Sequence, residues 1–320
     1  MNNFIQPNRP GWYYRLNSFF RHKFGEPVYK IPLDAGFSCP NRDGTIDNSG
    51  CSYCYVPSFA PFSKNNNAAS GTASISDQIK RGKKKKAEAK YLAYFQSYTN
   101  TYAPLKQLQV LYDEALNEPA VIGLSIATRP DCVTEEILNL LEIYACRCHL
   151  WIEYGLQSAH DRTLKQINRG HKVSSFEKAI KITHGRGIFI CAHIILGLPG
   201  ETPDMMLETI NFLNNLGIDG IKFHHLQVIK HTPLAEQYKL GNFPVYNKEE
   251  DYIPVLCDCL ERLAPHIVIH RLASQTVSKE LLIAPHWTKS GGQIASEVEN
   301  ELKKRGTYQG AYLDKNISLK

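Results

Sequence analysis

Three cysteines lie close together near the start of the chain, and their spacing suits a metal or iron–sulfur site. Cys39, Cys51 and Cys54 fall within CPNRDGTIDNSGCSYC, whose glycine- and asparagine-rich spacer lets the loop double back so that Cys39 meets the other two. Three thiolates leave one corner of an iron–sulfur cubane open for another molecule. Structural zinc normally takes four ligands, so a zinc site would need a distant histidine or cysteine; unliganded thiols are the remaining alternative.

Composition limits the class of protein that can carry this loop. The 320 residues are 43% hydrophobic and 21% charged, which is ordinary for a globular protein, and the net charge of +6 permits an anionic partner such as RNA without requiring one. No apolar run reaches about 18 residues, and residues 1–20 lack the uninterrupted apolar core of a secretory signal. Nine cysteines in such a chain argue against a disulfide framework. We therefore expect a cytoplasmic protein without a membrane segment.

Apolar, β-branched segments alternate with helical patterns and must position the cysteine loop. They predict strands at 29–35, 91–98, 121–128, 150–156, 188–196, 220–228 and 266–272. Alternation at roughly 30-residue spacing favours parallel βαβ units. The fold class is therefore α/β, either a full or partial TIM-type barrel or a doubly wound open sheet. In both topologies functional residues lie at the carboxyl ends of the strands.

Three helix starts are marked by capping patterns between these strands. Thr134 is expected to cap a helix that reaches Tyr144, and a capping box at residues 174–177 is expected to open the next one. Thr202 followed by Pro203 predicts a third helix start.

The cysteine loop resembles that of radical S-adenosylmethionine (SAM) enzymes. Those enzymes commonly carry C-x3-C-x2-C after the first barrel strand, with an aromatic residue before the last cysteine, the position held here by Tyr53. The spacer of eleven residues is similar to that of the branch related to the catalytic subunit of Elongator. CPNRDGT, YLAYFQSYTNTYAP, TRPDC, GLQSAHDRTLKQINRGH, LGLPGET and LLIAPHW resemble segments of the YhcC/YtqA-type radical SAM family.

This resemblance implies a fold and a division of the chain. The fold would be a partial (β/α)6-type TIM barrel of the radical SAM kind over residues 29–235. Residues 1–28 would form an N-terminal extension, and residues 236–320 a C-terminal extension packed on the barrel.

The resemblance also implies cofactors and the residues that hold them. A 4Fe–4S cluster on Cys39, Cys51 and Cys54 would cleave SAM reductively and so start hydrogen abstraction from a substrate. Arg169 is similar to an arginine that pairs with the SAM carboxylate, which suits a guanidinium fork. The implied SAM contacts are Tyr55, Ser97, Glu153, Gln157, Arg169 and His193. Structural roles remain as alternatives, such as a lysine partner for Glu153 or a core position for His193, and no general acid or base is assigned.

The substrate is inferred from a basic run at 81–86 beside aromatic residues between 91 and 102. This pattern is typical of RNA binding, or of a solvated basic helix followed by a buried strand. Candidate substrate-binding residues are Lys84, Lys85, His225, Lys230 and Arg271, with ordinary surface charge as the alternative.

The resemblance implies tRNA wobble-uridine modification, from carboxymethylaminomethyluridine to aminomethyluridine. The partners would be tRNA and an electron donor such as flavodoxin or ferredoxin. Two alternatives stay open, namely a radical SAM enzyme that acts on a small metabolite and a zinc-stabilised RNA-binding protein without catalysis.

Overall fold

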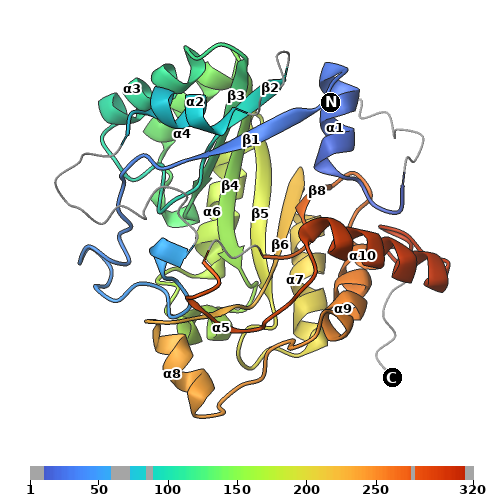
Figure 1. The fold of residues 1–320 in the computed structure, drawn as a ribbon. Helices are drawn as coiled ribbons and strands as arrows, with labels where there is room; N and C mark the ends of the chain where they lie inside the picture. Colours follow the sequence, from blue (N-terminus) through green and yellow to red (C-terminus); the bar gives the residue numbers. More distant parts are fainter. Residues whose placement is uncertain (1–10, 59–72, 84–88, 275–277, 314–320) are drawn as a thin grey trace.

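A curled sheet of seven parallel strands forms the framework of the protein (Figure 1). The computed structural model describes residues 11–58, 73–83, 89–274 and 278–313. The sheet order is β1-β2-β3-β4-β5-β6-β8, so the strands lie side by side in their order along the chain. Their bounds are β1 (Val28–Leu33), β2 (Lys90–Phe95), β3 (Val121–Thr128), β4 (His149–Gln157), β5 (Phe189–Leu196), β6 (Gly220–His225) and β8 (Val268–Arg271).

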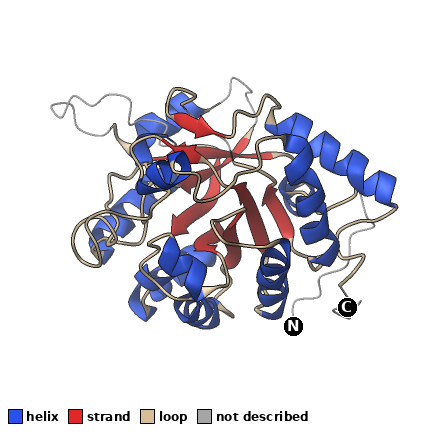
Figure 2. Ribbon diagram, turned by 90° about the horizontal axis from the view of Figure 1, so that it is seen from below, coloured by secondary structure: helices blue, strands red, loops and turns tan. Residues whose placement is uncertain are grey.

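This strand order decides between the two predicted topologies. A doubly wound sheet reverses its order at a central strand, whereas here the order never reverses. The sheet curls into part of a barrel with helices around its outside, as the view in Figure 2 shows. The partial TIM-type barrel is therefore confirmed, and the seventh strand, β8, lies beyond residue 235.

Helices follow most strands and cover the outer face of the sheet. Their bounds are α2 (Ile75–Gly82), α3 (Leu105–Leu116), α4 (Glu135–Ala145), α5 (Asp161–Gln166), α6 (Val173–Thr183), α7 (Pro203–Asn215) and α9 (Glu249–Arg262). Outside this alternation are α1 (Leu16–Phe24), α8 (Pro233–Lys239) and α10 (Gly291–Arg305), with two short 3-10 helices, η1 (Val56–Ser58) and η2 (Pro130–Cys132). None of the helices in the described ranges is long and apolar enough to span a membrane.

The two faces of strand β4 differ: apolar side chains face the core under the outer helices, and other residues face the polar interior of the barrel. Ile152, Tyr154 and their alternate neighbours Leu150 and Leu156 are buried in the large core between the sheet and the outer helices. The residues between them point to the concave side, because successive side chains of a strand face opposite ways. Glu153 and Gly155 therefore line a cavity inside the curl of the sheet, together with Gln157 at the end of the strand.

Two of the three predicted helix starts have the expected caps. The Thr134 hydroxyl accepts from Ile137 N at the start of α4, and Thr202 accepts from Met205 N at the start of α7. The predicted capping box at Ser174 is wrong, because Ser174 lies inside α6, which begins at Val173. A carboxylate oxygen of Asp161 in α5 accepts from Val173 N at 2.7 Å instead, so the acceptor comes from a preceding helix.

Segments from both ends of the described chain meet at the amino ends of the barrel strands. Phe19 and Phe20 of α1 pack with Trp151 and Val268 at the amino ends of the strands and close the barrel there. Tyr14 N donates to Gln309 Oε1 at 2.8 Å, and Ile269 N of β8 donates to Tyr14 O at 2.7 Å.

The segment predicted as one strand at 220–228 is interrupted. Its first part is β6, and β7 (Val228–Ile229) leaves the barrel sheet to pair antiparallel with β9 (Leu282–Ala284). The chain therefore turns away from the barrel directly after its sixth strand and returns to it with β8.

Candidate cofactor and substrate site

A cavity of about 290 Å³ lies inside the curl of the sheet, at the carboxyl ends of the strands. Cys39, Cys51 and Cys54 all line it. The loop that carries them needs a glycine next to Cys51, since Gly50 has a φ of 77° and a side-chain carbon there would approach Arg42 Nε to 2.8 Å. The loop thus folds back as its composition predicts, and it brings the three thiols to one cavity.

Hydrogen-bond donors lie beside the Cys51 sulfur and the Cys54 backbone. Arg169 Nη1 and Asn41 Nδ2 both lie 3.6 Å from Cys51 Sγ. Arg42 donates to the carbonyl of Cys54. The Arg169 guanidinium also donates to Gly155 O at 2.8 Å, and it is 6% exposed. The buried Arg169 and the half-buried Arg42 place two cations beside the cysteine loop, which suits a negatively charged thiolate-bound centre.

The sulfur positions can be compared with what each kind of centre requires. Among the described residues, the three cysteines do not form a ligand set whose atoms all lie within 4.8 Å of one another. A single zinc ion with Zn–S bonds of about 2.3 Å would need such a set. A 4Fe–4S cluster binds each cysteine through a different iron atom and so spreads them further apart. The residues therefore fit a cluster better than one zinc ion.

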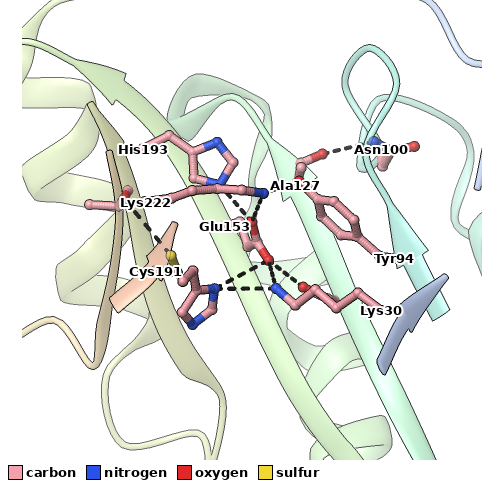
Figure 3. Close-up of polar contacts among 11 residues, drawn as sticks. Lys30, Tyr94, Asn100, Ala127, Glu153, Cys191, His193 and Lys222 are labelled. Carbon is pink, nitrogen blue, oxygen red and sulfur yellow. Dashed lines mark hydrogen bonds and ion pairs between the residues drawn. The ribbon is translucent and has the colours of Figure 1, made fainter. Parts of the chain in front are cut away.

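Glu153 organises the polar interior of the barrel (Figure 3). Its side chain is fully buried and binds groups from five other strands. Nε2 of His193 lies 2.6 Å from one carboxylate oxygen, and Lys222 Nζ lies 3.1 Å from the same atom. The other oxygen accepts from Lys30 and from the Ser125 hydroxyl, with His270 Nδ1 at 3.7 Å.

Electrostatics fix the charges in this network. Burial works against ionisation of Glu153, but Lys222 and Lys30 outweigh it and hold the pKa of that carboxyl well below its usual range. Burial lowers the pKa of Lys222 to about 7, against the opposing effect of Glu153. Burial likewise lowers the pKa of His193 to about 4 and that of His270 to about 3, so both imidazoles are neutral at pH 7.

The structure brings most of the predicted site residues to the cavity. Its lining includes Cys39, Cys51, Cys54, Glu153, Gln157, Arg169, His193, His225 and Arg271. Gln157 ends β4 with a φ of 76°, a strained backbone position of the kind often found at functional sites.

Other predicted residues lie elsewhere. Tyr55 packs against the ring of His231 and does not line the cavity, and Ser97 is buried behind its neighbours Gln96 and Tyr98, which do line it. Lys230 is exposed and lines neither described cavity. Lys84 and Lys85 lie outside the described residues.

Sequence reasoning missed Lys30 as a site residue and left the role of Tyr94 open. Lys30 lies in the middle of β1 with apolar neighbours on both sides, and that isolated charge within a strand was the available signal. For Tyr94 the sequence allowed either stacking on RNA bases or a position in a buried strand; Tyr94 is buried in β2, and its hydroxyl accepts from Lys222 Nζ at 2.6 Å inside the barrel.

A curled parallel sheet whose first strand leads into a three-cysteine loop, above a buried polar network, defines a partial-barrel metalloenzyme. The chain belongs to the Radical SAM superfamily, whose family profile matches residues 47–213, and the profile of the Radical_SAM C-terminal domain matches residues 218–304. It is a radical SAM enzyme of the YhcC type, related to Elongator, and its cofactors are a 4Fe–4S cluster and S-adenosylmethionine.

The individual relatives cover most of the chain. YtqA of Bacillus subtilis (strain 168) is 37% identical over 98% of this chain and 97% of its own length. YhcC of Escherichia coli (strain K12) is 36% identical over 91% of this chain and 92% of its own length. A solved structure of Elp3 from Methanocaldococcus infernus has the same fold, with a TM-score of 0.65, 18% identity, and coverage of 91% of this chain and 68% of that one.

A more distant relative shares only part of the chain. The tRNA uridine(34) acetyltransferase of Methanocaldococcus infernus is 33% identical over a segment that covers 43% of this chain and 26% of its own length.

Proposed function

We propose that this enzyme binds its cluster through Cys39, Cys51 and Cys54 and modifies the wobble uridine of tRNA, converting carboxymethylaminomethyluridine to aminomethyluridine. The assignment of the cluster ligands rests on one observation: all three thiols line one cavity together with Arg169. When bound, the cluster and SAM supply the radical chemistry that removes a hydrogen atom from the substrate. The protein binds and orients these groups and shields them from water.

Arg169 is well placed to hold SAM beside the cluster. Two of its nitrogens are engaged by Cys51 Sγ and Gly155 O. Its Nε is buried and has no hydrogen-bond partner among the described residues. An unsatisfied buried donor is costly, so a carboxylate ligand would stabilise this site.

Glu153 takes a different role from the one the resemblance implies. Its oxygens are already occupied by lysine, serine and histidine side chains, which leaves little capacity for a ribose. We assign it a positioning role, since it holds His193 at the cavity wall, where that histidine can contact SAM. Gln157 has its side chain on the same wall.

Two observations support tRNA as the substrate. A segment of the chain is similar to an enzyme named as a tRNA uridine(34) acetyltransferase, and the net charge of +6 is compatible with a polyanionic partner. The wobble base is unpaired in the anticodon loop, so it can enter an enclosed cavity at low cost. Flavodoxin or ferredoxin would deliver the electron that a radical SAM enzyme requires.

The cofactor assignment is tested by anaerobic reconstitution followed by measurement of 5′-deoxyadenosine. Cys51→Ala should abolish its formation and reduce the bound iron. Cys146→Ala is the matched control, because Cys146 is exposed and lies outside the cavity. SAM cleavage that survives in Cys51→Ala would reject the ligand set.

The substrate is tested by mass spectrometry of tRNA nucleosides from a deletion strain. We expect carboxymethylaminomethyluridine to accumulate at the wobble position and to disappear when the gene is restored. Unchanged nucleosides would reject the tRNA substrate and leave a small metabolite as the better candidate for the same cofactor site.

A further inference from the structure

A second cavity reaches the interior of the barrel from the side. It has a volume of about 760 Å³ and lies between the two edge strands of the sheet, β1 and β8, where α1 and α10 also line it. None of the three cysteines lines this cavity. Tyr94, Gln96, Lys222 and Arg271 line both cavities, so they form the boundary between the cluster side and the lateral side.

Positive charge exceeds negative charge at this boundary. Lys222, Lys30 and Arg271 meet there, and the neighbouring carboxylate is Glu153, which is shared by both lysines. The charge of Arg271 acts on Lys222 and on His224. Glu153 balances one of these three positive charges, so the remaining positive charge favours an anionic ligand.

Arg271 is the cation that remains available. No carboxylate among the described residues lies within 4 Å of its guanidinium, whereas Lys30 and Lys222 both contact Glu153. Arg271 is half-buried at the end of β8 and faces both cavities. A guanidinium fork binds a carboxylate through two parallel hydrogen bonds.

We propose that Lys222 and Arg271 form an anion subsite that binds the carboxylate of the substrate, which enters through the lateral cavity. This inference rests on the proposed function, because the carboxymethylaminomethyl group of the uridine ends in a carboxylate. The lateral cavity has the volume of a typical small-ligand site and so accommodates a nucleoside. The subsite distinguishes substrate from product, since aminomethyluridine lacks the carboxylate.

Binding of two anticodon stem-loop RNAs to the reconstituted enzyme with SAM tests the subsite. One RNA carries carboxymethylaminomethyluridine and the other carries aminomethyluridine at the wobble position. The wild-type protein should bind the first about tenfold more tightly or better. Arg271→Gln should remove this preference without weakening binding of the second RNA, and Arg271→Lys should keep part of it.

A control variant tests whether the loss of preference is specific to Arg271. Lys181→Gln removes an exposed cation on the outer helix α6 and should keep the full preference. Equal affinities for the two RNAs in the wild-type protein, or a preference that persists in Arg271→Gln, would overturn the assignment of the subsite to this substrate.

A measurement without RNA separates the subsite from the proposed function. Acetate is added at constant ionic strength while the ε-carbon resonance of Lys222 is followed by NMR in the reconstituted enzyme. Acetate should raise the titration midpoint of Lys222 in the wild-type protein and not in Arg271→Gln. No acetate effect would reject the anion subsite, whereas an acetate effect with unchanged tRNA in the deletion strain would reject the tRNA function alone.

Discussion

The Glu153 side chain contacts side chains from nearly all the other strands of the barrel. It lies on β4 and contacts Lys30 of β1, Ser125 of β3 and His193 of β5, and also Lys222 of β6 and His270 of β8. Lys30 Nζ also lies 3.2 Å from His270 Nδ1, which joins the two edge strands of the sheet. The carboxylate therefore fixes the shape of the interior as well as its charge.

Glu153→Gln should destabilise the fold strongly. The change leaves Lys30 and Lys222 without their anionic partner in a buried site, which costs about 3–5 kcal/mol when one member of a buried ion pair is removed. Urea unfolding at pH 7 measures this loss. Glu208→Gln, at a side chain that is 64% exposed, should change stability by less than about 0.5 kcal/mol; equal effects of the two substitutions would contradict the role of Glu153.

Lys222 should titrate near pH 7 in the protein without ligands. Burial lowers its pKa from the usual 10.5 to about 7, so between these values the unfolded chain binds a proton that the folded protein has released. Its contribution to stability therefore becomes more favourable as the pH rises from 7 to 10.5, and it is constant below pH 7. NMR of ε-carbon-labelled lysines measures the midpoint, and Lys222→Arg identifies the resonance. A midpoint above 10 would show that the site is hydrated.

Individual site residues were predictable where a short motif carries them. The three cysteines and Arg169 lie in local patterns, and they reach the same cavity as expected. Lys30 and His270 belong to the site because β1 and β8 curl towards each other, and no local pattern encodes that contact. The hydrogen bonds and ion pairs that occupy the Glu153 carboxylate likewise come from side chains on five other strands.

At the level of elements, helix caps depend on geometry that a short pattern describes incompletely. Thr134→Ala should lower the free energy of unfolding by about 1 kcal/mol, because the hydroxyl accepts from Ile137 N. Ser174→Ala should have almost no effect, since Ser174 is exposed and lies within α6. Thermal unfolding of both variants measures the difference, and a larger loss in Ser174→Ala would contradict the observed cap.

The strands were predicted more reliably than their ends. Each of the seven barrel strands overlaps an apolar segment of the sequence, because a parallel strand covered by helices must be hydrophobic on its outer face. The segment at 220–228 was predicted as one strand but contains the end of β6 and all of β7. Its pairing with β9 involves residues more than 50 positions later, which local hydrophobicity does not report.

At the scale of the whole molecule, the barrel and the C-terminal region share one core. Tyr252 and Leu256 of α9 and Val298 of α10 are buried together with the barrel strands. A chain that ends at residue 235 would also lack β8, the neighbour of β6 in the sheet. We therefore expect that truncated chain to lose cooperative unfolding and to bind hydrophobic dyes. A single cooperative urea transition with native near-ultraviolet circular dichroism would show instead that residues up to 235 fold independently.

The hydrogen bond between Tyr14 and Gln309 has a consequence for biosynthesis. These residues are 295 positions apart, so a nascent chain that leaves the ribosome amino end first exposes Tyr14 long before Gln309 exists. At about 5–20 residues per second this delay lasts roughly 15 to 60 seconds. During that time the Tyr14 backbone lacks its final acceptor, and the aromatic face of α1 itself stays uncovered until its core partners Trp151 and Val268 have been synthesised.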